Sequence, residues 1–311
     1  MTARTAHLGS LPRRVAGALA LAAAAVALSA APAIASSHPA NVQWETFLPA
    51  MPSPNTPQPG AVPYCRRPSM KCIDTEVRRL RAAQKRFRCD HRGVFATTYL
   101  ELTRALRIAL KRDRRLFRYR HYLFTEDALF ANIYFNSLKL YERGRPVPPA
   151  WQIAFDTARE GSVNAAQDML LGINAHVQND MPFMLAALGL RTRKGESRKP
   201  DHDVMNEVLD GAYEQVVSAV ARRYDSFVTI SNASWNPLDD VGGLEMVKGW
   251  REQVWRNAER LLNARSDTER AQVAEQIRQN AAMWARGMAA PQTPGYRAQR
   301  DAYCATGPAA K

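Results

Sequence analysis

The chain has 311 residues, 46% of them hydrophobic, and a formal net charge of +14 at pH 7. After residues 1–35, no stretch has the run of ~20 apolar residues that a membrane-spanning helix needs, so no transmembrane helix is expected in the mature chain. About 240 residues of mostly helical patterning follow, enough for one sizeable core without a second domain.

Residues 1–35 have the order of a secretory signal peptide. Arginines precede the apolar run "VAGALALAAAAVALSA", and the small residues "AIA" stand at the cleavage position. Cleavage near Ala35 predicts a secreted or extracytoplasmic mature chain that begins near Ser36. Removal of three arginines and no acidic residue lowers the net charge from +14 to +11. Arg13 and Arg14 leave open whether export uses the general secretory or the twin-arginine route.

Residues 36–72 are expected to form a Pro-rich, poorly ordered lead-in. The stretch "PAMPSPNTPQPGAVP" combines proline with small and polar residues and has no apolar periodicity. Such a composition cannot bury enough apolar surface to order the chain.

Four cysteines follow the signal segment: Cys65, Cys72, Cys89 and Cys304. An even number in an exported protein indicates two disulfide bonds, for which three pairings exist. Cys65 and Cys72 are close enough for a local loop, which would leave Cys89 to connect the first long helix to the tail at Cys304. A metal site is the alternative, although the chain has no C-x-x-C pair.

The predicted fold class is all-α, a single multi-helix bundle over residues 73–290 with a proline-kinked central helix. Thr125 is a plausible N-cap of the third helix, and the fourth is expected to be interrupted near Gly161 and Pro182. Residues 291–311 are expected to form an irregular C-terminal tail. The expected helices cover 74–88, 91–112, 125–143, 149–188, 201–222, 241–264 and 267–288.

The stretch "LLGINAHVQNDMPFML" places His176 and Asp180 four residues apart on one face of the fourth helix. The opposite, solvent-facing side is expected to carry Asn164, Gln167, Asn174 and Gln178. Burial of an ionised carboxylate without a partner costs several kcal/mol, so Asp180 needs a cation, a donor or a shifted pKa. A His/Asp pair at this spacing can present two ligand atoms to one ion.

Three other helices carry polar residues on predicted apolar faces. Convergence of these helices would create a site for zinc or another divalent metal, because imidazole and carboxylate are ordinary ligands. The candidate ligands are His176, Asp180, His202, His91 and Asp127. Candidates that support these ligands or contact a substrate are Asn206, Asp203, Tyr134, Arg198 and Lys199. Alternatively, each histidine is a hydrogen-bonded core residue and Asp127 complements a helix dipole from a first turn.

Basic residues cluster at 78–88, 111–120 and 191–199. A basic surface outside a cell favours an anionic partner, such as an anionic small molecule, a phospholipid head group or a cell-wall polymer. A solvated surface that keeps the protein soluble is the alternative. The third cluster follows the His/Asp motif and is therefore the expected site of attraction for an anionic substrate. The sequence has no specific nucleic-acid motif.

Three segments, "CDHRGVFATTYLELT", "LLGINAHVQNDMPF" and "SRKPDHDVMNEVL", together resemble a family of helical actinobacterial proteins known as domain of unknown function 5995. The resemblance covers roughly residues 70–290 and implies an all-helical domain without an established activity. The residues of this chain that match the family's motifs are His91, His176, Asp180, His202 and Asn206.

The motif His176-x-x-x-Asp180 is also similar to the central motif of the zinc-dependent phospholipase C and nuclease family, whose members are secreted helical hydrolases of phosphodiesters. This local resemblance implies that both residues are metal ligands. The chain departs from the family in two respects. Signal cleavage leaves Ser36 in front, with Trp44 inside the lead-in, where the family has an N-terminal tryptophan ligand. The following "MPFMLAALGL" has no histidine.

Two functions remain open from the sequence. The first is a metal-dependent hydrolase of an anionic, phosphoester-type substrate, with a metal-bound water as the nucleophile. The second is a non-catalytic secreted binding or cell-envelope protein, in which the buried His, Asp and Asn residues form a hydrogen-bond network that fixes helix register. No G-x-S-x-G, H-E-x-x-H or phosphate-binding glycine loop indicates another chemistry.

Overall fold

The structure is a computed structural model that describes residues 43–48, 51, 62–228 and 237–310. The predicted signal peptide and much of the lead-in lie outside these ranges. Within them the protein is all-α, as predicted, and contains isolated β-bridges but no β-strand. None of the helices in the described ranges is long and apolar enough to cross a membrane.

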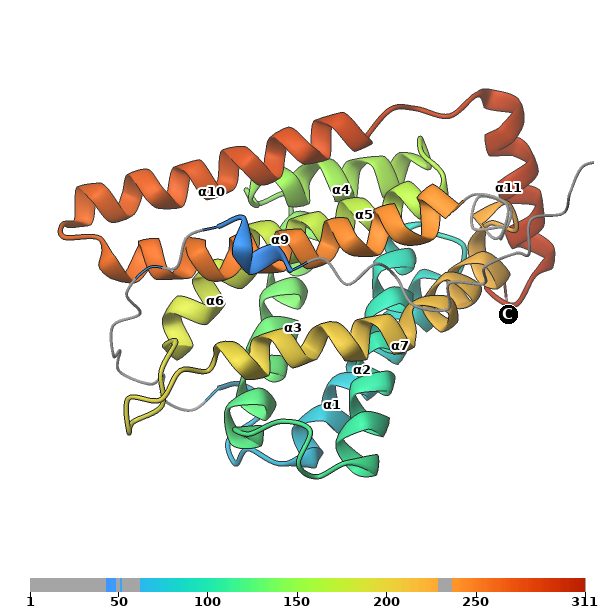
Figure 1. Cartoon of the computed structure of the whole chain (residues 1–311). Coiled ribbons are helices and arrows are strands. Elements are labelled where there is room, and N and C mark those ends of the chain that lie inside the picture. The colour runs from blue at the N-terminus through green and yellow to red at the C-terminus, as the bar shows by residue number, and fades with distance from the viewer. Residues whose placement is uncertain (1–42, 49–50, 52–61, 229–236, 311) are drawn as a thin grey trace, which may run out of the picture. The chain divides into compact units, whose positions relative to one another are not determined.

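The elements follow one another as short and long helices joined by brief loops (Figure 1). Their bounds are η1 Trp44–Thr46, α1 Met70–Phe87, α2 Arg92–Arg112, α3 Arg120–Glu142, α4 Pro149–Glu160, α5 Ala165–Asn174, η2 Ala175–Asp180, α6 Met181–Leu188, α7 Lys199–Tyr224, α9 Pro237–Asn263, α10 Asp267–Met288 and α11 Pro294–Thr306.

The segment α5–η2–α6 lies at the centre of the helical assembly. α1 packs on α2, α2 packs on α7, and α9 and α10 lie side by side (Figure 1). η2 contacts α3, α4, α9 and α10 in addition to its two chain neighbours. The His/Asp motif identified in the sequence is therefore enclosed by helices that lie both before and after it in the chain.

The predicted interruption near Gly161 is confirmed. Gly161 ends α4 in the left-handed conformation, with φ +56°, where a residue without a Cβ is favoured. Asn164 then caps α5, since its side chain accepts from the backbone N–H of Gln167 while the Gln167 side chain accepts from the N–H of Asn164.

The sequence predicted that the fourth helix is interrupted at Pro182, but the chain passes from η2 into α6 as continuous helix. η2 is a π-helix, in which hydrogen bonds span five residues, and it ends at Asp180. Pro182 then stands in the first turn of α6, so its missing N–H falls where the hydrogen bonding changes from the π-helical to the α-helical pattern.

The predicted start of the third helix at Thr125 is also wrong. α3 begins at Arg120, and the Thr125 hydroxyl donates to the carbonyl of His121 within the helix, over 3.2 Å. The start is held instead by a residue distant in sequence. The Asp201 carboxylate accepts from the backbone N–H groups of Arg118 and Tyr119, over 2.8 and 2.6 Å.

The described residues of the two terminal segments are more ordered than predicted. Residues 291–311 contain the helix α11, which Thr293 caps by accepting from the N–H of Tyr296. In the lead-in, Cys65 is buried and α1 begins at Met70, before the predicted boundary. The apolar periodicity on which the prediction relied is weak in both segments, and contacts with the rest of the chain supply their order.

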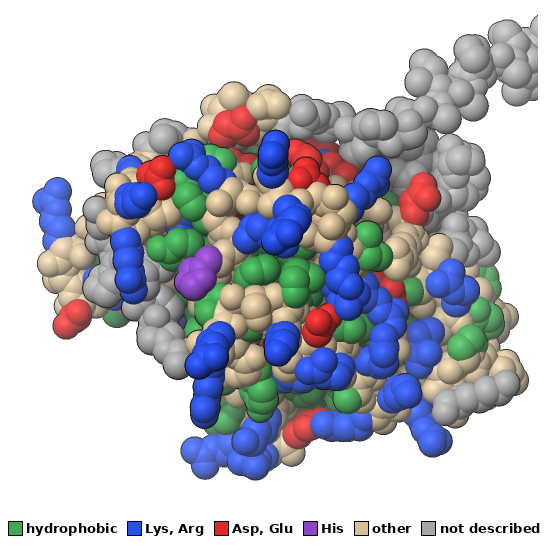
Figure 2. Space-filling view, turned by 90° about the horizontal axis from the view of Figure 1, so that it is seen from below, with side chains coloured by type: hydrophobic (Ala, Val, Ile, Leu, Met, Phe, Trp, Pro, Cys, Tyr) green, Lys and Arg blue, Asp and Glu red, His purple; other side chains and the backbone are tan. Residues whose placement is uncertain are grey.

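Lys and Arg side chains gather on the face that α1 and α2 help to form (Figure 2). The exposed basic residues of α1 include Lys71, Arg78, Arg81 and Lys85, and those at the end of α2 and beyond it include Lys111, Arg112, Arg114 and Arg115. The first two basic clusters predicted from the sequence therefore lie in solvent on neighbouring elements.

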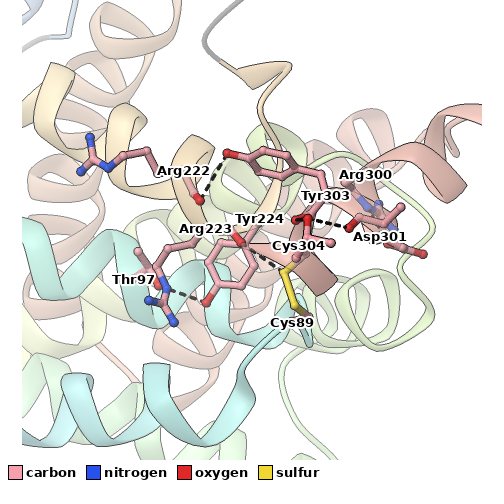
Figure 3. The surroundings of a disulfide bond; sticks show 11 residues. Cys89, Thr97, Arg222, Arg223, Tyr224, Arg300, Asp301, Tyr303 and Cys304 are labelled. Atoms are coloured by element: carbon pink, nitrogen blue, oxygen red, sulfur yellow. Dashed lines mark hydrogen bonds and ion pairs between the residues drawn. A yellow bond between two sulfur atoms is a disulfide. The ribbon is translucent and has the colours of Figure 1, made fainter. Parts of the chain in front are cut away.

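The predicted pair of disulfides is confirmed, with the pairing Cys65–Cys72 and Cys89–Cys304. The second bond joins the α1–α2 connection to α11, beside Tyr224 (Figure 3). The buried Arg300 attaches the same helix to the α4–α5 connection by donating to the carbonyls of Gly161 and Val163.

Candidate functional site

A central cavity of about 620 Å³ lies between α2, α3, α5, η2, α7 and α9. Most of its wall is apolar, formed by residues such as Leu102, Leu106, Phe130, Ile173, Val177 and Leu209. Five of the polar side chains on the wall are Tyr99, Asp127, Tyr134, His176 and Arg251. The exposed residue Gly242 of α9 also belongs to the wall.

His176 and Asp180 bond to each other within the π-helix. The distance between His176 Nδ1 and Asp180 Oδ2 is 2.9 Å, and both side chains are almost fully buried. Trp151 of α4 donates its indole N–H to the same oxygen over 2.8 Å, and Asn179 donates to Asp180 Oδ1 over 2.7 Å. Three donors therefore satisfy the buried Asp180 carboxylate without a cation.

Aromatic rings enclose the His176 imidazole. Phe130 stacks on it with a centroid distance of 3.5 Å and an interplanar angle of 4°. Tyr99 and Phe95 meet it edge-on at 5.0 and 5.5 Å. Phe95 reaches this position because Gly172 leaves room, since a Cβ at residue 172 would lie 2.3 Å from the Phe95 ring. The imidazole is thus held in one orientation.

His176 is a neutral imidazole at neutral pH. Burial lowers its pKa, and the hydrogen bond and charge of Asp180 oppose this effect only in part. A neutral imidazole has one N–H, and the carboxylate partner places it on Nδ1. Nε2 is then a bare acceptor, and it is buried without a hydrogen-bond partner among the described residues.

His91 forms a separate pair with Asp168 of α5. Its Nδ1 lies 2.5 Å from Asp168 Oδ2, and the ring packs edge-on against Tyr224. Burial raises the pKa of Asp168, and the contact with His91 lowers it. Neither residue of the pair lines the central cavity.

His202 belongs to a third set, together with Arg251 of α9 and Asn206. His202 Nε2 donates to the Arg251 carbonyl over 3.0 Å, and Arg251 Nε donates to Asn206 Oδ1 over 2.7 Å. Burial, reinforced by the positive charges of Arg251 and Lys199, holds the pKa of His202 well below its ordinary value. This set links α7 to α9.

Asp127 lies near a second buried acid, Glu76 of α1. It stands in the middle of α3, so the expected role in a first turn does not apply. Burial raises its pKa well above the ordinary value, and the negative charges of Glu76 and Glu126 raise it further. Burial likewise raises the pKa of Glu76 on α1 to about 7, against the lowering effect of Arg79. Asp127 Oδ2 has no partner among the described residues.

Two basic residues predicted to attract a substrate are already paired. Arg198 is 4% exposed and donates to the Glu126 carboxylate over 2.9 Å. Lys199 forms ion pairs with Asp203 and Glu252, both at 2.6 Å. Burial raises the pKa of Asp203, whereas Lys199 lowers it. These contacts anchor the 191–199 loop to the helices.

The five predicted metal ligands are divided among separate environments. His176 and Asp180 are together, whereas His91, His202 and Asp127 each have other neighbours. Within the described ranges, no group of three or more His, Cys, Asp or Glu side chains could hold a metal ion. As folded, the His176–Asp180 pair does not offer two free atoms to one ion, because each uses its facing atom for the other.

The prediction that Asn174 and Gln178 face solvent on the central helix is wrong. Asn174 and Gln178 are buried under α10. Asn174 donates to the Ala281 carbonyl over 2.8 Å, and Gln178 accepts from Asn280 over 2.7 Å. Amide side chains can be buried when helices pack on both sides, because hydrogen bonds replace their contact with water.

Three residues that complete these sets were not identified from the sequence: Trp151, Asp168 and Arg251. Trp151 follows Pro149 on an apolar helix face, which indicates a core residue but not its partner. Asp168 lies in the first turn of α5, where an acid is usual in any case. Arg251 is one of several arginines on α9. Only the three-dimensional packing distinguishes these residues from their neighbours.

Comparison with known proteins supplies a family but no activity. Neither the curated proteins nor the solved structures contain a match to this chain. The model of one family, described as a family of unknown function (DUF5995), matches residues 73–291, which is more than half of the chain. The match includes the central cavity and all three histidine sets. The chain therefore belongs to the DUF5995 family of unknown function.

Proposed function

We propose that this protein binds an apolar small molecule in its central cavity. The observation that carries the proposal is the cavity itself, with a volume of about 620 Å³ and a largely apolar wall. Sites for small molecules and cofactors have volumes of roughly 300–1,000 Å³, with apolar walls and a few placed polar groups. An apolar cavity of this size is uncommon in a protein core, which is otherwise close-packed.

We further propose that binding takes place outside the cytoplasm. The two disulfides are typical of proteins that fold in an oxidising compartment, and the predicted signal peptide would deliver the chain there. The exposed basic residues of α1 and of the α2 end would attract an anionic surface such as phospholipid head groups or a cell-wall polymer. In this proposal the basic face attaches the protein and the cavity holds the ligand.

A metal-dependent hydrolase remains a second proposal, based on the His-x-x-x-Asp motif. Support within the structure is limited to His176 Nε2, a buried ligand atom without a partner among the described residues. Plasma mass spectrometry on exported, dialysed protein tests it directly. One or more zinc or manganese ions per chain, lost in an Asp180→Ala, His176→Ala double variant, would establish a metal site. Metal-free protein would leave the pair with its hydrogen-bonding role.

The binding proposal is tested with the fluorescent apolar probe N-phenyl-1-naphthylamine and a pair of matched variants. Ala131→Trp fills the cavity from α3, whereas Leu140→Trp adds the same side chain at an exposed position of the same helix. We expect wild type and Leu140→Trp to bind one probe per chain, and Ala131→Trp to bind at least tenfold more weakly while keeping its circular dichroism spectrum. Equal binding by all three proteins would contradict the proposal, as would no binding by wild type.

A further inference from the structure

Three buried polar atoms on the cavity wall lack a hydrogen-bond partner among the described residues. They are His176 Nε2, Tyr134 Oη and Asp127 Oδ2. Buried polar atoms are nearly always paired in folded proteins, and an unpaired one costs free energy. All three side chains line the same cavity, whose wall therefore includes residues with unpaired polar atoms.

The chemical character of His176 Nε2 is determined by its surroundings. Asp180 fixes the proton on Nδ1, and Trp151 and Asn179 hold Asp180 in turn. Phe130 prevents the imidazole from rotating. Nε2 therefore cannot donate, and a ligand group that bonds to it must bring its own proton.

This requirement selects among ligand groups. A carboxylate has no proton to offer Nε2 and would need a cation, yet Arg251, the arginine on the wall, already donates to Asn206, to the His202 carbonyl and to Met181. An ammonium group would be deprived of water beside apolar side chains, and burial disfavours the ionised form of Asp127, the acid on the wall whose Oδ2 has no partner among the described residues. A hydroxyl group fits, because it brings the proton that Nε2 needs and carries no charge into the apolar cavity.

We infer that His176 Nε2 accepts a hydrogen bond from the hydroxyl group of the ligand, and that the ligand is an apolar alcohol. The inference rests on the proposed binding function and adds the class of ligand. The hydrocarbon part occupies the apolar wall, and the His176–Asp180–Trp151 arrangement recognises the single polar end. His176 is in this view a specificity-determining residue.

Two isomeric ligands test the inference, 1-decanol and 1-methoxynonane, which have the same atoms but differ in their ability to donate. Displacement of N-phenyl-1-naphthylamine measures their binding to wild type, to His176→Phe and to His121→Phe. The first variant keeps an aromatic ring against Phe130 but removes Nε2, and the second alters an exposed histidine.

We expect wild type and His121→Phe to bind the alcohol about tenfold more tightly than the ether, the ratio that corresponds to one hydrogen bond. His176→Phe should bind both equally. Equal binding of alcohol and ether by wild type would overturn the inference but leave the binding function intact. Failure of both to displace the probe would contradict the binding function itself. Decanoate binding more tightly than the alcohol would also overturn the inference.

A measurement on unaltered protein keeps the test valid even if His176→Phe does not fold. In wild-type protein labelled with ¹⁵N-histidine, the non-protonated Nε2 resonance of His176 should move to lower frequency when 1-decanol is added, because Nε2 accepts a hydrogen bond. Addition of 1-methoxynonane should leave it in place. An Nε2 resonance unaffected by bound alcohol would overturn the inference.

Discussion

Trp151 on α4 donates its indole N–H to the Asp180 carboxylate at the end of η2, over 2.8 Å and across 29 residues of sequence. The contact fastens the one π-helical segment of the described chain to a neighbouring helix. It also keeps Asp180 in position to orient His176. The stability of the fold and the chemistry of the cavity wall thus depend on the same hydrogen bond.

Trp151→Phe should lower the free energy of unfolding by about 2–4 kcal/mol, because it removes a donor from a buried carboxylate and leaves a small void. Denaturation by guanidinium chloride measures the change. In an Asp180→Leu background the same substitution should cost less, since no carboxylate remains to be satisfied. Equal costs in the two backgrounds would show that packing alone accounts for the role of Trp151.

Glu76 makes the protein less stable as pH rises. Its pKa is raised in the fold from 4.5 to about 7, so the folded state binds more protons than the unfolded state between these values. The free energy of unfolding should therefore fall from pH 4.5 to 7 and stay low above pH 7. Glu76→Gln should remove the part of this slope that Glu76 contributes, leaving the part due to other buried acids such as Asp127, and be more stable at pH 8 by on the order of 3 kcal/mol.

Thermal denaturation of the Glu76→Gln variant between pH 5 and 8 checks this expectation. The matched control is Glu275→Gln, whose acid is exposed, lies 3.8 Å from Arg278 and accepts from the Gln279 side chain over 3.0 Å. The control should follow the wild-type curve. A wild-type slope retained in Glu76→Gln would assign the pH dependence to another group, with Asp127 the next to be substituted.

The two disulfides should differ in their contribution to stability. Cys89–Cys304 closes a loop across 215 residues, whereas Cys65–Cys72 spans only 7. Since a cross-link restricts the unfolded chain more when its loop is long, replacing both cysteines of the long bond by serine should cost about 4–5 kcal/mol. The equivalent change in the short bond should cost less. Calorimetric melting of both variants decides the order.

The basic face should bind anionic membranes in a salt-dependent manner. Reversal of Arg78, Arg81 and Lys85 to glutamate should weaken binding to phosphatidylglycerol vesicles by at least about a hundredfold, since each basic residue lost costs about 1 kcal/mol and each glutamate adds repulsion. The control reverses Arg265, Arg270 and Arg286, which are exposed in and beside α10. Vesicle cosedimentation at low and high salt measures both. Equal losses of vesicle binding in the two variants would show that the net charge of the protein, and not this basic face, attracts the membrane.

Local patterns in the sequence were sufficient for most helix positions. Apolar residues recur every three to four positions in α1, α2, α7 and α10, and the ends of these helices lie close to the expected bounds. The π-helix was not predictable, because π-helical hydrogen bonds between Ala175 and Asp180 have no distinct residue pattern. α11 was missed because prolines, glycines and polar residues dominate its segment, and a disulfide and Arg300 order it.

The sequence identified residues of the candidate site, but it did not predict how they are arranged in space. His176 and Asp180 were expected to face inward and do so. Their partner Trp151 is on another helix, and the partners of His91 and His202 are likewise distant in sequence. Which buried histidines meet depends on helix packing angles, which periodicity along one chain does not specify. The cavity is itself a property of that packing.

The Cys89–Cys304 bond also has a practical consequence. The segment matched by the family ends at residue 291, before Cys304 and before all of α11. A recombinant protein cut at that boundary would keep the thiol of Cys89 without its mate and could cross-link to a second molecule as a covalent dimer. Expression of this domain for screening should therefore extend to the end of α11.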